Sequence, residues 1–372
     1  ATDIYGVARP ASGSSSVGAY QFTQNITNAY SALVGGTTYF INGVDNLPTN
    51  ANPTVGSFAT YGSFVNHLNS FGTQGTGTIN IVFATGFLLD ATVPPAILPY
   101  PGMLGTRGIK VTAASGVNVN LTIAAGQAIC NNSAVIKLYG ASFFEIDGTD
   151  GNNGKAITIS LPASASAIQA KLIALVPTLM HPVSYTTVRN CTLTGSSSPT
   201  TVNTYAAVYM GAGNVAAGVG NAIGGANTNN FIGNNTIEAV RTGIYWRAKA
   251  ELTDQFLTIY RNVIGGTVTF GGSANTTFIG GGAANMAGIY IKGVSQGLID
   301  SNIIRNSLIN ATGFRGIDID APTTDLITNL QAQNINVTRN TIYNLGSSSG
   351  FAAGIRVGLS QTGRSILIAN NT

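Results

Sequence analysis

The stretch IGNNTI at 232–237 is one copy of a six-residue frame that recurs through the second half of the chain. The frame has apolar residues at its first and last positions and Asn at its fourth. The later copies are IYRNVI at 259–264, IDSNII at 299–304, VTRNTI at 337–342 and the truncated IANNT at 368–372. An earlier copy, VRNCTL at 188–193, carries Cys191 in place of Asn. Recurrence of this kind is typical of repeat architectures.

A second frame alternates with the first and consists of a small residue, an apolar residue, any residue and another apolar residue. Its copies are AVYM at 207–210, GIYW at 243–246, GIYI at 288–291, GIDI at 316–319 and GIRV at 354–357. Both frames have the period-2 apolar pattern of short strands. One coil cannot bury its apolar face alone and must stack on its neighbours. The alternation therefore predicts an all-β fold, a right-handed parallel β-helix.

Stacking would place equivalent residues of successive coils about 4.8 Å apart. The fourth position of the first frame then forms a ladder, in which each Asn amide bonds the neighbouring coil. The predicted ladder consists of Cys191, Asn235, Asn262, Asn302, Asn340 and Asn371. Cys191 is predicted to be a small buried residue at the edge of the ladder rather than a reactive thiol. A disulfide between Cys191 and Cys130 is left open.

The composition excludes several classes of protein. Charged residues make up 8% of the 372 residues, against about 25% in an average soluble domain. Disordered chains and coiled coils carry far more charge, and a net charge of +4 is too small to indicate a nucleic-acid partner. The longest apolar stretch, at 167–176, is too short to span a membrane. Stacked coils also disfavour charge, because like charges would lie directly opposite each other.

The N-terminal part has a different pattern. In SFATYGSFVNHLNS at 57–70, apolar residues three and four apart predict an amphipathic helix, which would cap the exposed strand edges at one end of the solenoid. We therefore predict N-terminal strands and a capping helix at 1–78, and a parallel β-helix at 79–372 that continues beyond the chain.

The segment AIQAKLIALV at 167–176 favours a strand, with a short helix as the alternative. The opening ATDIYG favours a secreted chain cleaved at a small-residue site.

The run from SFATYGSFVNHLNSFGTQGTGTINIVFATG through VIKLYGASFFEIDG to the NNTI and GIYI repeats resembles the right-handed parallel β-helix modules of large secreted bacterial surface proteins. Many of these proteins leave the cell by the type 9 secretion route. The resemblance covers roughly residues 20–372. It implies an extracellular or cell-surface location and an adhesive or structural role. Such modules usually carry no assigned activity.

Many right-handed β-helices are polysaccharide lyases or glycoside hydrolases, and this is the alternative function. The best carboxylate pair is Asp318 and Asp320 in GIDID, which are two positions apart on one predicted strand and point outward. Neither of the two histidines, His67 and His181, lies near them in the sequence. Asp147, with Asp150, is predicted to shape a turn. We therefore predict no catalytic residue, no metal site and no cofactor.

The outward positions of the second frame suggest a binding face. They form a predicted tyrosine column beside a strip of mixed charge, a combination that suits sugar rings or protein surfaces. The alternative is that Tyr packs well on a half-exposed strand. The candidate ligand-binding residues are Tyr209, Tyr245, Tyr290, Arg247, Lys292 and Arg356. Trp246 is predicted to point into the core. The predicted partners are cell-surface glycans, other surface proteins, or another chain at an open C-terminal end.

Overall fold

The computed structural model of the chain describes fifteen ranges of residues. They are 30–91, 93–103, 105–122, 134–151, 154–161, 170–178, 180–195, 204–211, 226–248, 253–266, 287–307, 314–319, 333–346, 352–358 and 365–372. The sequence predictions for Asp320, for Cys130 and for residues 1–29 lie outside these ranges. Within them the chain is mostly β, with one short helix.

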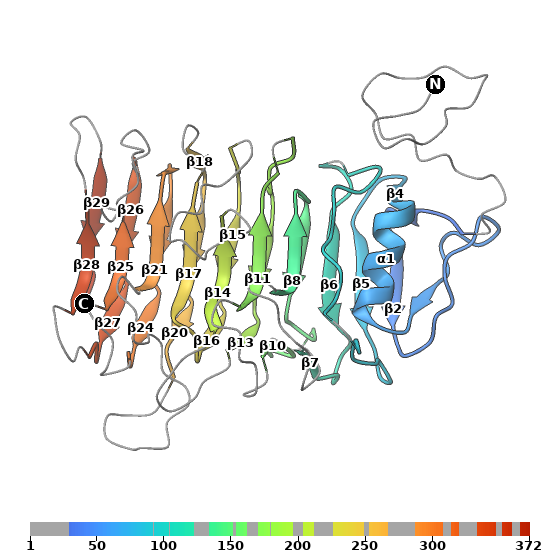
Figure 1. Cartoon of the computed structure of the whole chain (residues 1–372), viewed down its shortest axis with the longest axis horizontal. Helices are drawn as coiled ribbons and strands as arrows, with labels where there is room; N and C mark the ends of the chain where they lie inside the picture. The colour runs from blue at the N-terminus through green and yellow to red at the C-terminus, as the bar shows by residue number, and fades with distance from the viewer. Residues whose placement is uncertain are drawn as a thin grey trace.

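The longest sheet, sheet A, has eleven described strands that pair in parallel along the whole molecule (Figure 1). Its strands are β2 (Thr38–Ile41), β3 (Ser57–Phe58), β5 (Ile79–Phe83), β6 (Ile109–Ala113), β9 (Phe144–Asp147), β12 (Thr187–Arg189), β15 (Phe231–Gly233), β19 (Thr258–Tyr260), β23 (Leu298–Asp300), β26 (Ile335–Thr338) and β29 (Ile366–Ala369). Because β2 and β3 belong to it, sheet A begins upstream of residue 79.

Two further parallel sheets each have seven described strands. Sheet B contains β8 (Ala134–Tyr139), β11 (Ala170–Val176), β14 (Thr204–Met210), β17 (Thr242–Arg247), β21 (Ala287–Lys292), β25 (Arg315–Ile319) and β28 (Ala353–Val357). Sheet C contains β7 (Val119–Thr122), β10 (Ile157–Ser160), β13 (Thr192–Thr194), β16 (Thr236–Glu238), β20 (Val263–Ile264), β24 (Ile303–Arg305) and β27 (Thr341–Tyr343). Two small parallel pairs complete the list, β1 (Leu33–Val34) with β4 (Thr73–Gln74) and β18 (Asp254–Gln255) with β22 (Val294–Ser295).

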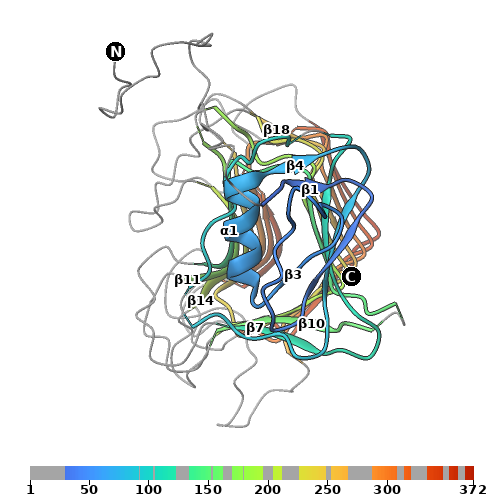
Figure 2. The same ribbon diagram turned by 90° about the vertical axis from the view of Figure 1, so that its right-hand side faces the viewer.

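Each coil visits the three sheets in the order A, C, B. Strand β15 of sheet A leads to β16 of sheet C and β17 of sheet B, and β19 then begins the next coil in sheet A. The view along the axis shows the sheets enclosing a common interior (Figure 2). This arrangement is that of a parallel solenoid, as predicted from the alternating frames. The described part of segment 167–176 is strand β11, so the preference for a strand over a helix is confirmed.

The second frame begins with a small residue because neighbouring coils lie very close there. A Cβ atom added to Gly243 would lie 2.5 Å from the carbonyl oxygen of Gly288, and one added to Gly316 would lie 2.5 Å from that of Gly354. The apolar residues that follow stack in register inside the solenoid, as Ile244, Ile289 and Ile317 do. Trp246 is fully buried, which confirms its predicted place in the core.

Helix α1 (Tyr61–Phe71) lies across the N-terminal end of the stacked strands (Figure 2). It begins four residues later than the predicted segment because Thr60 caps it, accepting a hydrogen bond from the Ser63 backbone N–H, and β3 precedes it. The rings of Phe58 and Phe64 meet edge to face, with centroids 5.6 Å apart. His67 contacts the carbonyl oxygen of Ser31 at 2.9 Å. Among the described residues, no helix is long and apolar enough to cross a membrane.

Candidate functional site

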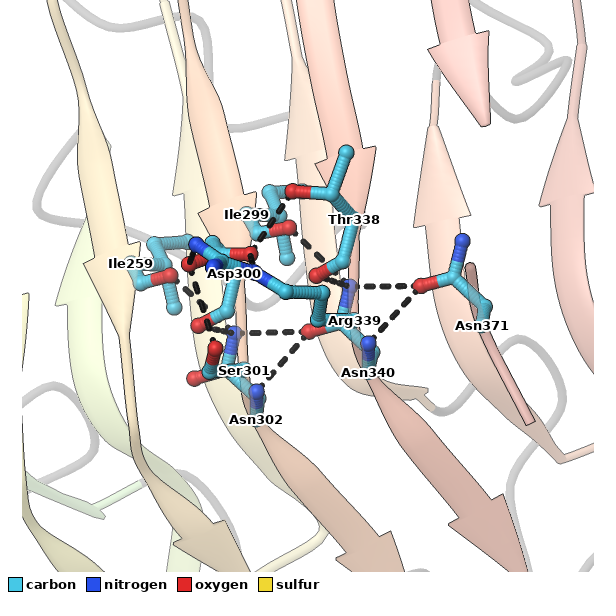
Figure 3. Close-up of polar contacts among 9 residues, drawn as sticks. All are labelled: Ile259, Ile299, Asp300, Ser301, Asn302, Thr338, Arg339, Asn340 and Asn371. Carbon is cyan, nitrogen blue, oxygen red and sulfur yellow. Dashed lines mark hydrogen bonds and ion pairs between the residues drawn. The ribbon is translucent and has the colours of Figure 1, made fainter. Parts of the chain in front are cut away.

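The predicted ladder forms a continuous chain of amide hydrogen bonds inside the solenoid. From Asn262 to Asn371, each Asn side chain accepts from the backbone N–H and the Nδ2 of the equivalent Asn one coil earlier, and donates to a carbonyl of that coil. For Asn302 the Oδ1 lies 3.0 Å from both the N and Nδ2 of Asn262, and the Nδ2 lies 3.0 Å from the carbonyl oxygen of Ile259. The pattern repeats from Asn235 to Asn371. Figure 3 shows its last three members, Asn302, Asn340 and Asn371.

Cys191 ends the ladder as predicted. Its side chain is free and fully buried, and its backbone N–H donates to Asn235 Oδ1 at 3.0 Å. Burial raises the pKa of the Cys191 thiol to about 12, with a smaller contribution in the same direction from Asp147. A thiol of this kind is not a nucleophile at neutral pH. Cys191 is therefore a structural residue.

The left-handed turn at this corner lies one residue before each ladder position. The residues with positive φ are Asn190, Asn234, Arg261, Ser301, Arg339 and Asn370. Asp300 anchors one of these residues, because Arg339 Nε donates to Asp300 Oδ1 at 2.9 Å (Figure 3). Hydrogen bonds from Arg339 lower the pKa of the Asp300 carboxyl. We name this edge of sheet A, with the amides behind it, the ladder corner.

The tyrosine column forms in the predicted register, but it is not an exposed face. Tyr209 pairs with Tyr245 and Tyr245 with Tyr290 in neighbouring strands of sheet B. The rings stack nearly parallel, with centroids 5.2 and 4.8 Å apart. Tyr209 and Tyr290 are buried and Tyr245 is half-buried. The expected display of ring faces to a ligand is therefore wrong, because the faces pack against one another and Tyr205 packs edge-on against two of them.

The charged strip beside this column is also buried. Arg247 and Lys292 are register partners with 3% and 8% of their surface exposed. Lys171, which the sequence did not single out, places its Nζ 4.8 Å from the Tyr209 ring centroid, and burial lowers its pKa to about 8. Arg356 is half-buried and binds Asp318 through two hydrogen bonds of 2.8 and 2.6 Å. These cations belong to the packing on the outer side of sheet B.

The same contacts weigh against Asp318 as a catalytic acid. Its carboxylate is fully buried and is held by the Arg356 guanidinium in a bidentate pair. A general acid for glycoside hydrolysis must instead reach the glycosidic oxygen of the substrate, which a fully buried carboxyl group does not do. The two histidines are elsewhere, His67 on the buried face of helix α1 and His181 at an exposed turn. The contacts of Asp318 are therefore those of a structural residue that pairs with Arg356.

A cluster of four charged side chains lies on the outer side of sheet A, where the sequence indicated only a turn. Asp147 contacts Lys110 Nζ at 2.9 Å and Arg189 Nη2 at 2.9 Å, and Glu145 contacts Arg189 Nη2 at 2.7 Å. Burial opposes ionisation of Asp147, but hydrogen bonds from Asn190 and Lys110 outweigh burial and lower its pKa. Asp147 Oδ1 also accepts hydrogen bonds from the backbone N–H and the hydroxyl of Thr149. Asp147 therefore shapes the turn, as predicted, and also belongs to the charged cluster.

Three aromatic residues lie at the corner where the chain enters sheet A, and two of them, Tyr185 and Phe256, are exposed. One residue per coil adopts a left-handed conformation there, and its N–H bonds the next coil, as Phe143 does to the Ser184 carbonyl at 3.0 Å. We name this edge the aromatic corner. In order along the axis it consists of Phe143, Tyr185, Asn229, Phe256, Gln296 and Asn334.

The aromatic residues at this corner are conformationally unfavourable. Phe143, Tyr185 and Phe256 have φ angles of 58°, 53° and 55°. Side chains with a Cβ lose about 1–2 kcal/mol in this region, and Asn and Gly tolerate it best. The chain places Asn at the equivalent positions 229 and 334, so the same turn folds without a ring. Tyr185 and Phe256 nevertheless expose 51% and 47% of their surface. Unfavourable backbone geometry with an exposed ring indicates a role other than folding.

A shallow groove adjoins this corner. Its volume is about 480 Å³, and its walls include Phe143, Tyr185, Lys110, Glu145 and Thr187. The Phe143 and Tyr185 rings stack with centroids 4.9 Å apart and an interplanar angle of 15°. The volume is within the range of small-ligand sites. An aromatic wall beside charged groups therefore forms the best candidate binding site among the described residues.

Sequence reasoning missed the aromatic corner, although a positional signal exists. Each corner residue lies three positions before the first apolar residue of the six-residue frame, for example Tyr185 before Val188 and Phe256 before Ile259. The six-residue frame covers the strand and the Asn that follows it, and it does not include the residues that precede the strand. Among the described residues, no group of three or more His, Cys, Asp or Glu lies close enough to hold a metal ion. Comparisons with protein-family models, curated proteins and solved structures found no match to the chain.

Proposed function

We propose that this chain is a non-catalytic surface or adhesive module, a right-handed parallel β-helix that works outside the cell and binds glycans through the aromatic corner. The extracellular location and the type 9 route rest on the resemblance of its repeats to secreted bacterial surface proteins. The observation that carries glycan binding is the set of exposed aromatic rings held in left-handed conformation along one edge of sheet A.

The chemistry of this corner suits a sugar. Aromatic rings offer flat apolar faces to the C–H groups of a pyranose, and the polar groups beside them bind its hydroxyls. The groove supplies Lys110, Glu145 and Thr187 next to Tyr185. The exposed rings are separated by polar residues rather than fused into one apolar patch, which favours a sugar over a large protein interface.

Non-catalytic binding is favoured over polysaccharide cleavage by the state of the carboxylates. Glu145 and Asp147, the acids nearest the groove, contact Lys110 and Arg189, and the pKa of Asp147 is lowered. Proton donation to a leaving group requires a carboxyl group whose pKa is raised instead of lowered. Asp147, whose ionised form is stabilised by hydrogen bonds from Asn190 and Lys110, is therefore a poor proton donor.

Affinity electrophoresis of the whole chain on a panel of neutral and acidic polysaccharides tests this function. We expect retardation by at least one polysaccharide, with no new reducing ends and no unsaturated products after prolonged incubation. Release of products by the wild type, abolished in Glu145→Gln and Asp147→Asn, would replace the proposal with the enzymatic alternative. No retardation by any polysaccharide would exclude glycan binding.

A further inference from the structure

The aromatic corner contains a gap the size of one ring. Phe143 and Tyr185 occupy successive coils, and Phe256 follows Tyr185 after one intervening coil, whose corner residue is Asn229. Successive coils are about 4.8 Å apart, which agrees with the 4.9 Å between the Phe143 and Tyr185 ring centroids. Tyr185 and Phe256 are therefore separated by roughly two coil steps, about 10 Å. One ring position between them, above Asn229, has no aromatic side chain.

The stack at this corner has an open end at the gap. The outer face of Phe143 lies near Gly105, where an added Cβ would approach the ring to 3.2 Å, and its other face packs on Tyr185. Phe143 covers one face of the Tyr185 ring, the coil of Asn229 follows on the other side along the axis, and Tyr185 exposes 51% of its surface. Asn229 is itself exposed.

We propose that this gap is a sugar subsite, in which one pyranose ring inserts between Tyr185 and Phe256 and its edge hydroxyls bond the Asn229 amide. The proposal rests on the glycan-binding function proposed above and makes it specific. A ring in this position lies one coil step from each aromatic ring, the same separation as in the Phe143–Tyr185 stack. It takes the place of the missing member of the stack.

This geometry selects a class of sugar. A ring held between two aromatic faces must present C–H groups on both of its faces. Pyranoses whose ring substituents are all equatorial, such as β-linked glucose, N-acetylglucosamine or xylose units, meet this condition. An axial hydroxyl or an axial linkage would place a polar group against one aromatic ring and leave it without a hydrogen bond. The subsite should therefore discriminate by stereochemistry rather than by charge.

Titration calorimetry with cellohexaose, chitohexaose, xylohexaose and maltohexaose tests the subsite. Phe256→Asn removes one wall and places a side chain that the left-handed turn tolerates well. Asn229→Phe fills the gap with protein. Arg261→Asn is the matched control, because it makes the same kind of change at a left-handed residue of the ladder corner and alters no ring of the aromatic corner. We expect at least one all-equatorial oligosaccharide to bind, each gap variant to weaken it about tenfold, and the control to leave its affinity unchanged.

The outcomes separate this subsite from the general function. If the wild type binds an oligosaccharide and both gap variants bind it equally well, the subsite is wrong while glycan binding stands. Preference for maltohexaose over the other three would overturn the stereochemical selection. If the wild type binds none of the four and no polysaccharide in electrophoresis, both proposals fail. Thermal unfolding of each variant shows whether it is folded at the temperature of the titration.

Discussion

The two corners of sheet A have the same backbone conformation, with one left-handed residue per coil. The side chains at these left-handed positions differ between the two corners. At the ladder corner that residue is Asn, Ser or Arg and is followed by a buried amide, whereas at the aromatic corner it is Phe, Tyr, Asn or Gln. The ladder corner is held by Asn-to-Asn hydrogen bonds inside the solenoid. The aromatic corner places rings in solvent on a backbone that disfavours them.

The difference separates residues that hold the fold from residues that the fold presents. Amides of the ladder corner satisfy buried backbone groups of the neighbouring coil, so their loss would leave donors unpaired. Rings of the aromatic corner satisfy no hydrogen bond, and an Asn at the same position gives the same turn. Replacement should therefore harm stability at one corner and binding at the other.

The largest effect is expected at the ladder. Asn302→Ala removes the acceptor for two buried donors, the backbone N–H and the Nδ2 of Asn262. Each unsatisfied buried donor costs about 1–3 kcal/mol, so we expect the free energy of unfolding to fall by about 4 kcal/mol. Urea denaturation followed by circular dichroism measures this loss. Gln296→Ala at the aromatic corner is the control and should change stability by well under about 1 kcal/mol.

A second prediction concerns Asp254, a buried carboxylate two residues before Phe256 of the aromatic corner. Asp254 is buried and accepts hydrogen bonds from the backbone N–H and Nδ2 of Asn227, each at 2.9 Å, and from Trp246 Nε1 at 2.8 Å. Burial raises its pKa to about 6, against an ordinary value of 3.8. The folded state therefore holds the proton more tightly than the unfolded state. Stability attributable to this group is lowest at neutral pH and rises as the pH falls through 6 toward 4.

Comparison with Asp254→Asn isolates this dependence. Buried His67, whose pKa burial lowers to about 4, has the opposite effect in the same range, because its folded pKa is depressed. Its contribution cancels in the difference between wild type and variant. We expect the free energy of unfolding of the wild type, relative to that of Asp254→Asn, to increase by up to about 3 kcal/mol when the pH is lowered from 7 to 4. A flat difference would mean that Asp254 titrates normally. Asn302→Ala should show the same deficit at both pH values, since amides do not titrate.

A third, smaller effect is expected at the aromatic corner itself. Phe256→Asn relieves an unfavourable left-handed conformation, and we expect the free energy of unfolding to rise by about 1 kcal/mol. The matched change at the ladder corner is Arg261→Asn, which gains the same relief but loses the contact of the guanidinium with the Tyr260 ring at 4.9 Å. It should be close to neutral. A marked loss of stability in Phe256→Asn would show that the ring belongs to the packing.

The solenoid could be predicted from sequence because stacking repeats the same residue at the same place. The ladder from Cys191 to Asn371 and the inward Trp246 follow directly from the frames. Exposure of the tyrosine column could not be predicted, because period-2 alternation shows which side of a strand a residue faces and not what lies over that side. The charged cluster was also hidden, since Lys110, Asp147 and Arg189 come from three strands far apart in sequence. The aromatic corner lies just outside the frame and does not repeat one residue type.

The smallest effect is expected from the ion pair on the solvent side of the ladder corner. Arg339→Gln keeps the long side chain but removes the charge that faces Asp300. The guanidinium side chain is 66% exposed, so water and salt weaken the pair. Because the pKa of Asp300 is lowered, the stabilisation is present at neutral pH and is lost as the pH falls below the ordinary range of an aspartate. Thermal unfolding at pH 7 should show a small decrease for the variant, and the decrease should shrink at acidic pH or in high salt. A loss as large as that of Asn302→Ala would mean that the exposed ion pair, and not the buried amides, holds this corner together.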